Sequence, residues 1–492
     1  MSATAPLVIV GAGPAGLAAA IEAARAGLPV TLLDEAPRIG GQIYRQPPRA
    51  FSVKQARLQG KEYARGRALR EEFETVASHV EVRGGTSVLG IWGERELQWA
   101  TASGSGTLKA EQLVLATGAY DRPLPFPGWT LPGVMTAGGA QAFVKTYGVK
   151  PGRRALIAGT GPLLLAVAKQ LHESGVEVVA VLEAGRPELS WRNVRRVWGQ
   201  WGLLKDAFDY HWALERAGIP VHYNHTVLEA HGAPELSRVT YAPIDPETWS
   251  PRREAATHAE VDLLLVGFGF VPSTELAVLA GCRHEYQHDW GGWVPVRDGL
   301  MRTSAANVFA AGDGTGVAGS LVAIEEGRVA GITAAEQAGK LTAQEATQRR
   351  QGPLRKLQKL APVRQALDEL SRLRPGLCEL ATPETVVCRC EEVRLSQVRA
   401  AVEQGARDLQ SVKLHCRLGM GACQGRNCAP SMGMYLAHAL GRSAEQVGRI
   451  NPRPPVKPAT LGALARFEML FSENKDHPNP DAGAAPARGE EP

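Results

Sequence analysis

The sequence predicts an α/β protein that contains two parallel strand–helix–strand domains and a small cysteine-rich domain near its C-terminus. Apolar segments run into glycine-rich turns at residues 7–35 and again at residues 155–183. Six of the seven cysteines fall between positions 378 and 428. A chain of 492 residues is also long enough for several domains, since a single core rarely grows beyond roughly 250–300 residues.

The first domain begins at residues 7–35, LVIVGAGPAGLAAAIEAARAGLPVTLLDE. An apolar strand enters a GxGxxG turn, an alanine-rich helix follows, and a second apolar strand ends in two acidic residues. In a Rossmann-like unit these glycines let a pyrophosphate approach the N-terminus of the helix, and the acidic residue accepts hydrogen bonds from a ribose. Because all the parts occur in order, they predict a dinucleotide site. Its residues are Gly11, Gly13, Gly16 and one of Asp34 and Glu35.

Residues 155–183, ALIAGTGPLLLAVAKQLHESGVEVVAVLE, repeat this pattern and predict a second Rossmann-like dinucleotide-binding domain. Leu164 stands where the third glycine belongs, and we expect it to push the helix away from the strand and narrow the phosphate site. Glu183 corresponds in spacing to Glu35. The pattern leaves open whether this domain holds a second nucleotide, NAD or ATP, through Gly159, Gly161 and Glu183.

Two further segments complete a recognisable order of motifs. LVLATGAYDRPLPFPG is an apolar strand ending in ATG, and TSAANVFAAGDGTG is a short strand ending in GD. GxGxxG, ATG, a second GxG and GD resemble the two-dinucleotide-domain flavoprotein family, which includes the disulfide reductases, over roughly residues 7–340. The resemblance implies FAD, with Asp313 at its ribityl or pyrophosphate portion. The residues that it adds to the FAD site are Gly40, Gly41, Gln42, Thr117, Gly118, Gly312 and Asp313.

One departure from that family bears on the chemistry. Disulfide reductases carry a redox-active cysteine pair beside the flavin, whereas this chain has no cysteine between Met1 and Gly281. We therefore expect electrons to leave the flavin by a route other than thiol exchange.

The clustered cysteines predict a metal site. Cys388-x-Cys390 and Cys423-x4-Cys428 are two close pairs, and the segment between them predicts one short helix and a loop. Such pairs, brought together by a small fold, place four thiolates around one site. The glycines of GMGACQGRNC are expected to turn the backbone sharply and to aim N–H groups at the sulfurs. Spacing alone leaves a tetrathiolate zinc site as the alternative.

The local sequence, CRCEEV followed by GMGACQGRNC, resembles the [2Fe–2S] domain of the bacterioferritin-associated ferredoxin type. It is most similar to the version fused to the larger subunits of hydrogen cyanide synthase, opine oxidases and D-hydroxyproline dehydrogenase, and related to the alpha chain of heterotetrameric sarcosine oxidase. The resemblance implies a [2Fe–2S] cluster that exchanges single electrons with the flavin domain. Its ligands would be Cys388, Cys390, Cys423 and Cys428, with Cys416 a surplus thiol and Cys282 and Cys378 core residues.

The predicted division of the chain has five parts. Residues 1–125 and 286–340 form a split FAD-binding domain, 126–285 the second Rossmann-like domain, 341–382 a basic helical linker interrupted at Pro362, 383–445 the cysteine domain, and 446–492 a C-terminal extension disordered at its end. The segment 191–212 is rich in Trp and Arg. It predicts either a surface for protein contacts or a segment that packs over its own domain.

Composition excludes several classes of function. The net charge of +5 is too small for its length to indicate a nucleic-acid partner. No stretch reaches the ~18–20 apolar residues of a membrane span. The residues before the first strand have no basic region or long apolar segment, so we expect no secretory signal. An odd number of clustered cysteines indicates a reducing compartment. We expect a cytoplasmic protein, and attachment to the inner membrane through a complex stays open.

The resemblance implies the alpha subunit of a multi-subunit amine or imino-acid dehydrogenase. A catalytic beta subunit with its own FAD would oxidise the small-molecule substrate, a D-hydroxyproline, an opine or glycine, and no residue of this chain would act as acid or base. An FMN at the subunit interface and a small ferredoxin-like subunit stay open. The alternatives are a stand-alone NAD(P)H-dependent flavoprotein with a [2Fe–2S] outlet and a non-catalytic protein with a zinc site.

Overall fold

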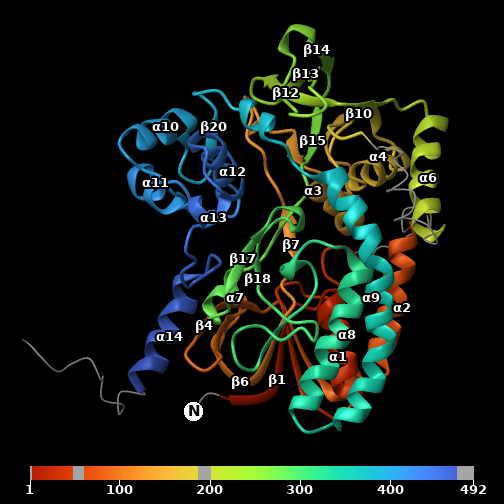
Figure 1. The fold of residues 1–492 in the computed structure, drawn as a ribbon, viewed down its shortest axis with the longest axis vertical. Coiled ribbons are helices and arrows are strands. Elements are labelled where there is room, and N and C mark those ends of the chain that lie inside the picture. Colours follow the sequence, from red (N-terminus) through yellow and green to blue (C-terminus); the bar gives the residue numbers. More distant parts are fainter. Residues whose placement is uncertain (1–2, 48–59, 187–200, 474–492) are drawn as a thin grey trace, which may run out of the picture.

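The computed structural model describes residues 3–47, 60–186 and 201–473. Figure 1 shows two α/β domains, one above the other, with a small helical domain at their side. The first sheet has the strand order β3-β2-β1-β6-β5-β4, with β19 pairing to β6. Its strands are β1 (Ala3–Val10), β2 (Val30–Asp34), β3 (Val80–Gly84), β4 (Ser87–Trp92), β5 (Glu96–Ala100), β6 (Ser105–Leu115) and β19 (Val308–Ala310). Residues 308–310 therefore join the sheet of residues 3–115 from far along the chain.

Two helices cover one face of this sheet in close backbone contact: α1 (Pro14–Arg25) and α8 (Ser320–Gln337). A Cβ added to Gly327 would lie 2.1 Å from the carbonyl oxygen of Ala15, and one added to Gly331 would lie 2.3 Å from that of Ala19. Only glycine fits at such a distance. The contact brings Gly312, just after β19, to the start of α1, where an added Cβ would lie 2.8 Å from the Ala15 Cβ.

The second sheet is parallel and has the order β11-β10-β9-β15-β8. Its strands are β8 (Val134–Thr136), β9 (Arg154–Gly159), β10 (Glu177–Glu183), β11 (Val221–Tyr223) and β15 (Leu263–Gly267). Leu164, on α4 (Leu163–Glu173), is fully buried beside Gly267 of β15, where an added Cβ would lie 2.8 Å from the leucine Cδ2. We expected Leu164 to displace the helix from the strand. Instead, Gly267 on the neighbouring strand provides the space for the leucine side chain.

The linker is one continuous helix, α9 (Ala343–Ser371), with Pro353 and Pro362 inside it. The predicted interruption at Pro362 is therefore wrong. The helix α9 packs along α8, and its C-terminal end reaches the domain that contains the second sheet (Figure 1). There the Ser371 Oγ lies 3.0 Å from the position of a Cβ added to Gly161.

The cysteine domain has its own apolar core. Its elements are β20 (Val386–Cys388), β21 (Val393–Arg394), α10 (Leu395–Glu403), α11 (Leu409–Cys416), α12 (Ala429–Leu440) and α13 (Ala444–Val447). The prediction of one helix between the cysteine pairs is wrong, because two helices, α10 and α11, lie there. Gly405, at φ +105°, follows the first helix, and the Asp408 side chain caps the second by accepting the Ser411 N–H at 2.7 Å.

The C-terminal extension returns to the first sheet. Val456 N–H donates to the carbonyl oxygen of Leu89 at 2.7 Å, and α14 (Leu461–Glu473) packs on β6. The end predicted to be disordered was residues 472–492. Ser472 and Glu473 instead belong to α14, and the rest lies outside the described residues, as does the first part of the Trp- and Arg-rich segment. The rest of that segment starts α6 (Trp201–Arg216), where Phe208 and Trp212 are exposed. In the described part of the chain, no helix is both long and apolar enough to cross a bilayer.

Candidate cofactor sites and the paired thiols

Three of the predicted FAD-binding segments meet at the carboxyl edge of the first sheet. They follow β1, β6 and β19, which pair in parallel, β1 with β6 and β6 with β19. A Cβ added to Gly11 would lie 2.2 Å from the carbonyl oxygen of Ala116, and one added to Gly314 would lie 2.8 Å from the Thr117 Oγ1. The GxGxxG, ATG and GD segments thus share one edge, where parallel α/β sheets bind their ligands.

The glycine pair of IGGQ closes over the first turn. Gly40 N–H donates to the carbonyl oxygen of Ala12 at 2.8 Å, and a Cβ added to Gly41 would lie 2.7 Å from the Gly13 Cα. Gly13 is the N-cap of α1 and supplies no side chain to bind the first N–H groups of the helix. A helix start without a side-chain cap favours an anion. These residues fit the pyrophosphate of a dinucleotide.

The structure separates the two acidic candidates at the end of β2. Asp34 accepts the N–H of Ala12 at 2.5 Å and that of Ala36 at 2.7 Å, so its carboxylate lies against the glycine turn. Burial raises the pKa of Asp34. Glu35 points to the surface and forms an ion pair with Lys457 of the C-terminal extension. Asp34 is therefore the better placed of the two for a ribose, a role that stays a prediction.

The GD segment holds its aspartate by backbone donors. Asp313 Oδ1 accepts the N–H groups of Ala318 and Gly319, both at 3.0 Å, and burial raises the pKa of its carboxyl group. Gln42 lies at the surface and pairs with Arg45 rather than with the other motif residues.

A further residue at this edge escaped the sequence analysis. A Cβ added to Gly316, three residues after Asp313, would lie 2.9 Å from the Arg364 Nη2 of α9. Arg364 is mostly buried, stacks on Trp290 at 4.7 Å from the ring centroid, and pairs with Asp368 at 3.6 Å. Its only signal in the sequence was the basic composition of the linker, which does not single out one arginine.

In the second domain, the counterpart of Glu183 is Asp34 and not Glu35. Gly159 faces Glu183 across the β9–β10 pair, as Gly11 faces Asp34 beyond the last β1–β2 partners, Val10 and Leu33. The register of β10 shifts at a bulge between Val178 and Ala180. That extra residue explains why counting from the glycines matched Glu183 to the wrong acid.

The longer side chain of Glu183 changes what the second turn offers. Glu183 accepts the N–H groups of Gly161 and Gly185, both at 3.0 Å. In the first domain, Asp34 accepts the N–H of Ala12, which is one position earlier in its turn than the equivalent of Gly161. Gly161 is the equivalent of Gly13, so an acidic group already occupies the amide that would face a phosphate. Burial raises the pKa of Glu183 to about 7, against the effect of hydrogen bonds from Thr160 and the two glycines.

The four predicted cluster ligands form two pairs. The buried thiols of Cys388 and Cys428 are in contact, and Cys390, which is exposed, contacts Cys423. The Cys428 thiol lowers the pKa of Cys388 to about 6, together with the backbone N–H groups of Gly419, Glu391 and Cys390, while burial opposes them. Of these three donors only Gly419 belongs to the glycine-rich loop, so the expectation that this loop directs N–H groups at a sulfur holds for one glycine.

Glycines make this approach of loop and thiols feasible. A Cβ added to Gly421 would lie 2.2 Å from the Cys390 Cβ, and Gly419 and Gly425 have φ of +76° and +87°. Cys416, by contrast, donates to the carbonyl oxygen of Val412 in its own helix at 3.2 Å. Cys282 and Cys378 are buried, as core residues would be.

Among the described residues, no group of three or more His, Cys, Asp or Glu side chains converges on a single metal ion. The thiols instead present two pairs. A tetrahedral zinc site needs four ligands around one ion, whereas a [2Fe–2S] cluster takes two thiolates on each of two irons. Two adjacent thiol pairs are thus compatible with the two irons of such a cluster.

Residues 5–339 match the family model of the pyridine nucleotide-disulphide oxidoreductases. The chain belongs to this family. It is thus a member of a family of flavin-dependent oxidoreductases, and membership implies FAD binding. Residues 382–466 match the sarcosine oxidase A3 domain, which covers the paired thiols.

Relatives extend the similarity over nearly the whole chain. The HcnB component of the hydrogen cyanide synthase of Pseudomonas aeruginosa is 39% identical over 95% of this chain and 99% of its own. An opine oxidase subunit from Agrobacterium tumefaciens is 33% identical over 94% and 91%. The structure of L-proline dehydrogenase from P. horikoshii has the same fold, with a TM-score of 0.68 and 22% identity over 94% of this chain and 80% of its own. The resemblance inferred from the motifs is confirmed, and the chain is related to subunits of multi-subunit flavoprotein dehydrogenases.

The variant Gly13→Val tests the FAD site in the isolated chain. Gly13 has φ of −77°, and an added Cβ meets nothing closer than the Gly41 Cα at 3.8 Å, so the fold should tolerate a side chain. The side chain would occupy the approach of the pyrophosphate, and we expect at least a tenfold loss of FAD affinity, which needs only about 1.4 kcal/mol. The amount of flavin released from the purified variant on denaturation measures this loss. Gly299→Val is the control, since Gly299 has open space around it. Unchanged flavin content in Gly13→Val would contradict the assignment.

Glu183 should make stability depend on pH. Between pH 4.5, its ordinary pKa, and about pH 7, the folded chain retains a proton that the unfolded chain has released, so stability falls as pH rises. The free energy of unfolding should fall by about 3 kcal/mol at most over this pH range, and Glu183→Gln should remove this dependence. The thermal midpoint of Glu183→Gln should therefore rise, relative to that of the unaltered chain, between pH 5 and pH 8. Glu177→Gln, at the exposed start of the same strand, is the control. An equal difference at both pH values would show that Glu183 does not titrate in this way.

Proposed function

We propose that this chain is the electron-transfer component of a multi-subunit amine or imino-acid dehydrogenase. Electrons would enter from the FAD of a partner catalytic subunit and leave to a quinone or another acceptor. One observation carries the proposal. Two pairs of adjacent thiols lie in a small domain, and the flavoprotein half to which it is joined has no cysteine up to Gly281. The thiols then serve in place of the disulfide that such flavoproteins use.

Each cofactor has residues suited to hold it. The turns at Gly11–Gly13, Gly40–Gly41 and Gly312–Asp313 would hold FAD, and Cys388, Cys390, Cys423 and Cys428 would hold a [2Fe–2S] cluster. When bound, the flavin handles one or two electrons and the cluster one at a time. The chain's own contribution is to position them and to set the potential, through the N–H groups directed at the Cys388 sulfur.

Substrate oxidation belongs to the partner in this proposal. The relatives are named as subunits of hydrogen cyanide synthase, opine oxidase and sarcosine oxidase, and each of these names refers to a compound with a carbon–nitrogen bond. The substrate class is therefore an amine or imino acid such as glycine, an opine or D-hydroxyproline. Such an assembly would also contain an FMN between its subunits and a small ferredoxin-like subunit, and it would work in the cytoplasm or at the inner membrane.

The rival function is a stand-alone NAD(P)H-dependent oxidoreductase, and Glu183 argues against it. Its carboxyl group binds the Gly161 N–H, and Ser371 of α9 lies beside the same turn. Both occupy the place where the phosphates of a second dinucleotide would enter.

Two reductants distinguish these functions. NADH should leave the flavin absorbance of the isolated chain unchanged, because the second domain offers no open phosphate site. Adding an imino acid together with the catalytic partner should bleach it. Rapid bleaching by NADH alone, or amine dehydrogenase turnover by the isolated chain with an artificial acceptor, would favour the rival.

The thiol assignment is tested by comparing Cys390→Ser with Cys416→Ser. Both side chains are at least partly exposed, so neither change should disturb the core. We expect about two irons per chain in the unaltered protein and in Cys416→Ser, and loss of iron in Cys390→Ser, because the cluster needs four thiolates. Iron analysis beside zinc analysis measures this, with flavin content as the check on folding. Zinc in place of iron, or iron lost only from Cys416→Ser, would overturn the ligand set.

A further inference from the structure

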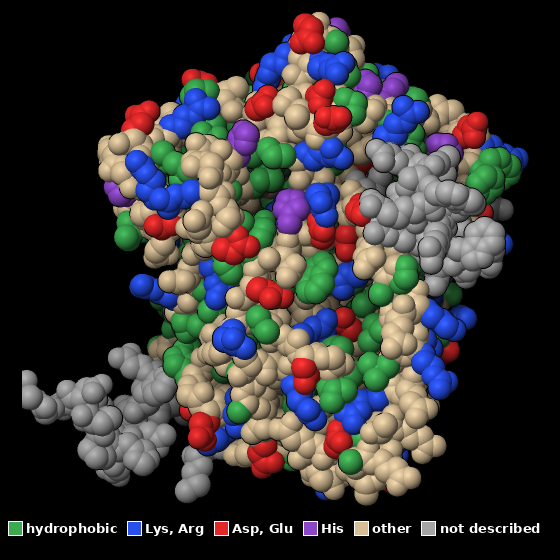
Figure 2. Space-filling view, viewed as in Figure 1, with side chains coloured by type: hydrophobic (Ala, Val, Ile, Leu, Met, Phe, Trp, Pro, Cys, Tyr) green, Lys and Arg blue, Asp and Glu red, His purple; other side chains and the backbone are tan. Residues whose placement is uncertain are grey.

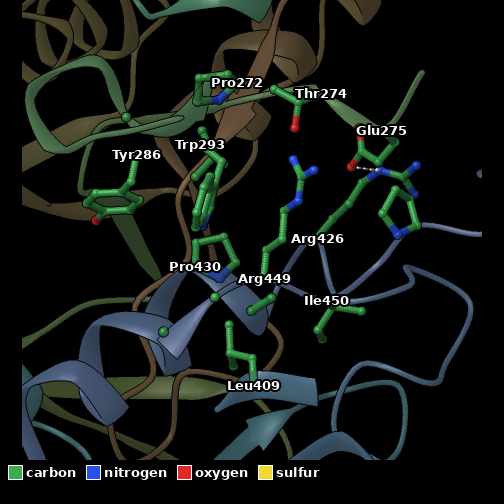
Figure 3. Close-up of a pocket in the computed structure, with 18 of the residues that line it drawn as sticks. Pro272, Thr274, Glu275, Tyr286, Trp293, Leu409, Arg426, Pro430, Arg449 and Ile450 are labelled. Atoms are coloured by element: carbon green, nitrogen blue, oxygen red, sulfur yellow. Dashed lines mark ion pairs between the residues drawn. The ribbon is translucent and has the colours of Figure 1, made fainter. Parts of the chain in front are cut away.

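A cavity of about 120 Å³ lies where the cysteine domain meets the flavoprotein half (Figure 3). One wall comes from β7 (Ala119–Asp121), β16 (Phe270–Pro272), α7 (Glu275–Leu279) and the hairpin of β17 (His284–Gln287) and β18 (Gly292–Pro295). The other comes from the loop before α12, α12 itself and the segment around α13. The FAD motifs and the four paired cysteines do not line the cavity, although the loop between Cys423 and Cys428 contributes Gln424, Gly425 and Arg426 to its wall.

Three arginines border this cavity, and one of them is paired. Arg426 forms an ion pair with Glu275 at 3.0 Å, drawn as a dashed line in Figure 3, and also donates to the carbonyl oxygens of Cys423 and Val456. Its charge and its N–H groups are thus largely satisfied within the chain.

Arg122 is partly buried and has no acidic partner among the described residues. Its Nη2 donates to the carbonyl oxygen of Gly291 at 2.7 Å, and burial lowers its pKa. The ionisable groups that face it are the phenols of Tyr286 and Tyr120 and the imidazole of His288, none of which is acidic enough to pair with it. Burial raises the pKa of both phenols, so they remain neutral and do not balance the arginine.

Arg449 is the least satisfied of the three. Its Nη1 is buried and has no hydrogen-bond partner in the described part of the chain. The guanidinium lies over the Trp293 ring, 5.5 Å from its centroid, and extends into the cavity beside the Arg426–Glu275 pair (Figure 3). Burial lowers the pKa of Arg449, and it faces His284, whose pKa burial and this arginine lower to about 4. Among the described residues on this side, no group carries a compensating negative charge.

Buried charges are costly unless a counter-charge or hydrogen bonds compensate them. Here two guanidinium groups, those of Arg122 and Arg449, have no carboxylate partner among the described residues, since Glu275 pairs with Arg426. Much of the remaining wall is apolar. The apolar lining consists of Val271, Pro272, Val278, Leu409, Ala429, Pro430, Met434, Ile450 and Pro452. The chemistry that matches is a single anionic group attached to an apolar body.

We propose that this cavity binds a small organic carboxylate, with its carboxylate on Arg449 and its apolar or aromatic body against Trp293 and the apolar wall. A guanidinium offers a carboxylate two parallel N–H donors, which suits an unpaired arginine. A free phosphate would leave the apolar wall unused. Because the walls come from both parts of the chain, the bound carboxylate also stabilises the contact between the cysteine domain and the flavoprotein half.

Benzoate and its neutral analogue benzamide are the probes, added to the full chain with its cofactors bound. We expect benzoate to raise the thermal midpoint and to give a calorimetric binding isotherm, and benzamide to do neither. Arg449→Met should raise the benzoate dissociation constant about tenfold or more, since it removes a charge-assisted hydrogen bond. Arg442→Met, an exposed arginine of the same domain, is the matched control and should bind as the unaltered chain does.

A second variant covers the case in which Arg449→Met does not fold. Gly433→Leu fills the cavity from α12 and keeps all three arginines, and it should abolish benzoate binding. The proposal is wrong if the unaltered chain does not bind benzoate, if benzamide binds equally well, or if benzoate binding survives in Gly433→Leu.

Discussion

Backbone-to-backbone packing between α1 and α8 is the constraint on which the flavoprotein half depends. Gly327 and Gly331 let α8 lie directly on α1, and Gly16 lets α1 lie on its own entering turn, where an added Cβ would be 1.7 Å from the Gly11 carbonyl oxygen. These contacts fix the GD loop, which precedes α8, against the GxGxxG turn, which precedes α1. Two segments about 300 positions apart in the chain thereby form one edge, at which α1 begins without a side-chain cap.

The same principle operates in the cysteine domain and is reversed in the second Rossmann-like domain. Gly421 brings the loop onto Cys390, so glycine again permits an approach that a side chain would block. In the second domain, Glu183 and Ser371 lie at the turn itself, and Leu164 fills space beside Gly267. The duplicated fold has kept its sheet, whereas the amide of its second glycine is bound by a side chain of the chain itself. That contrast assigns different tasks to two domains of the same architecture.

Much of this arrangement was accessible from the sequence because it depends on local motifs. A GxGxxG turn between two apolar strands, or two close pairs of cysteines, predicts geometry within a short segment. Features that depend on distant contacts were not accessible. The bulge between Val178 and Ala180 shifted the acid of the second domain by one position. The helix α9 continues through Pro362, and it packs against α8 and the segment His288–Trp290, which are distant in sequence. Arg364 and the Arg122–Arg449 cavity arise only where separate parts of the chain meet.

The central claim is that one chain holds a flavin and a one-electron centre. An anaerobic titration of the isolated full chain with dithionite, followed by absorbance, counts the electrons that it accepts. The account predicts about three electrons per chain, about two for FAD and one for the [2Fe–2S] cluster. Uptake of only about two electrons, with the flavin fully bleached and no further change in the visible spectrum, would contradict it.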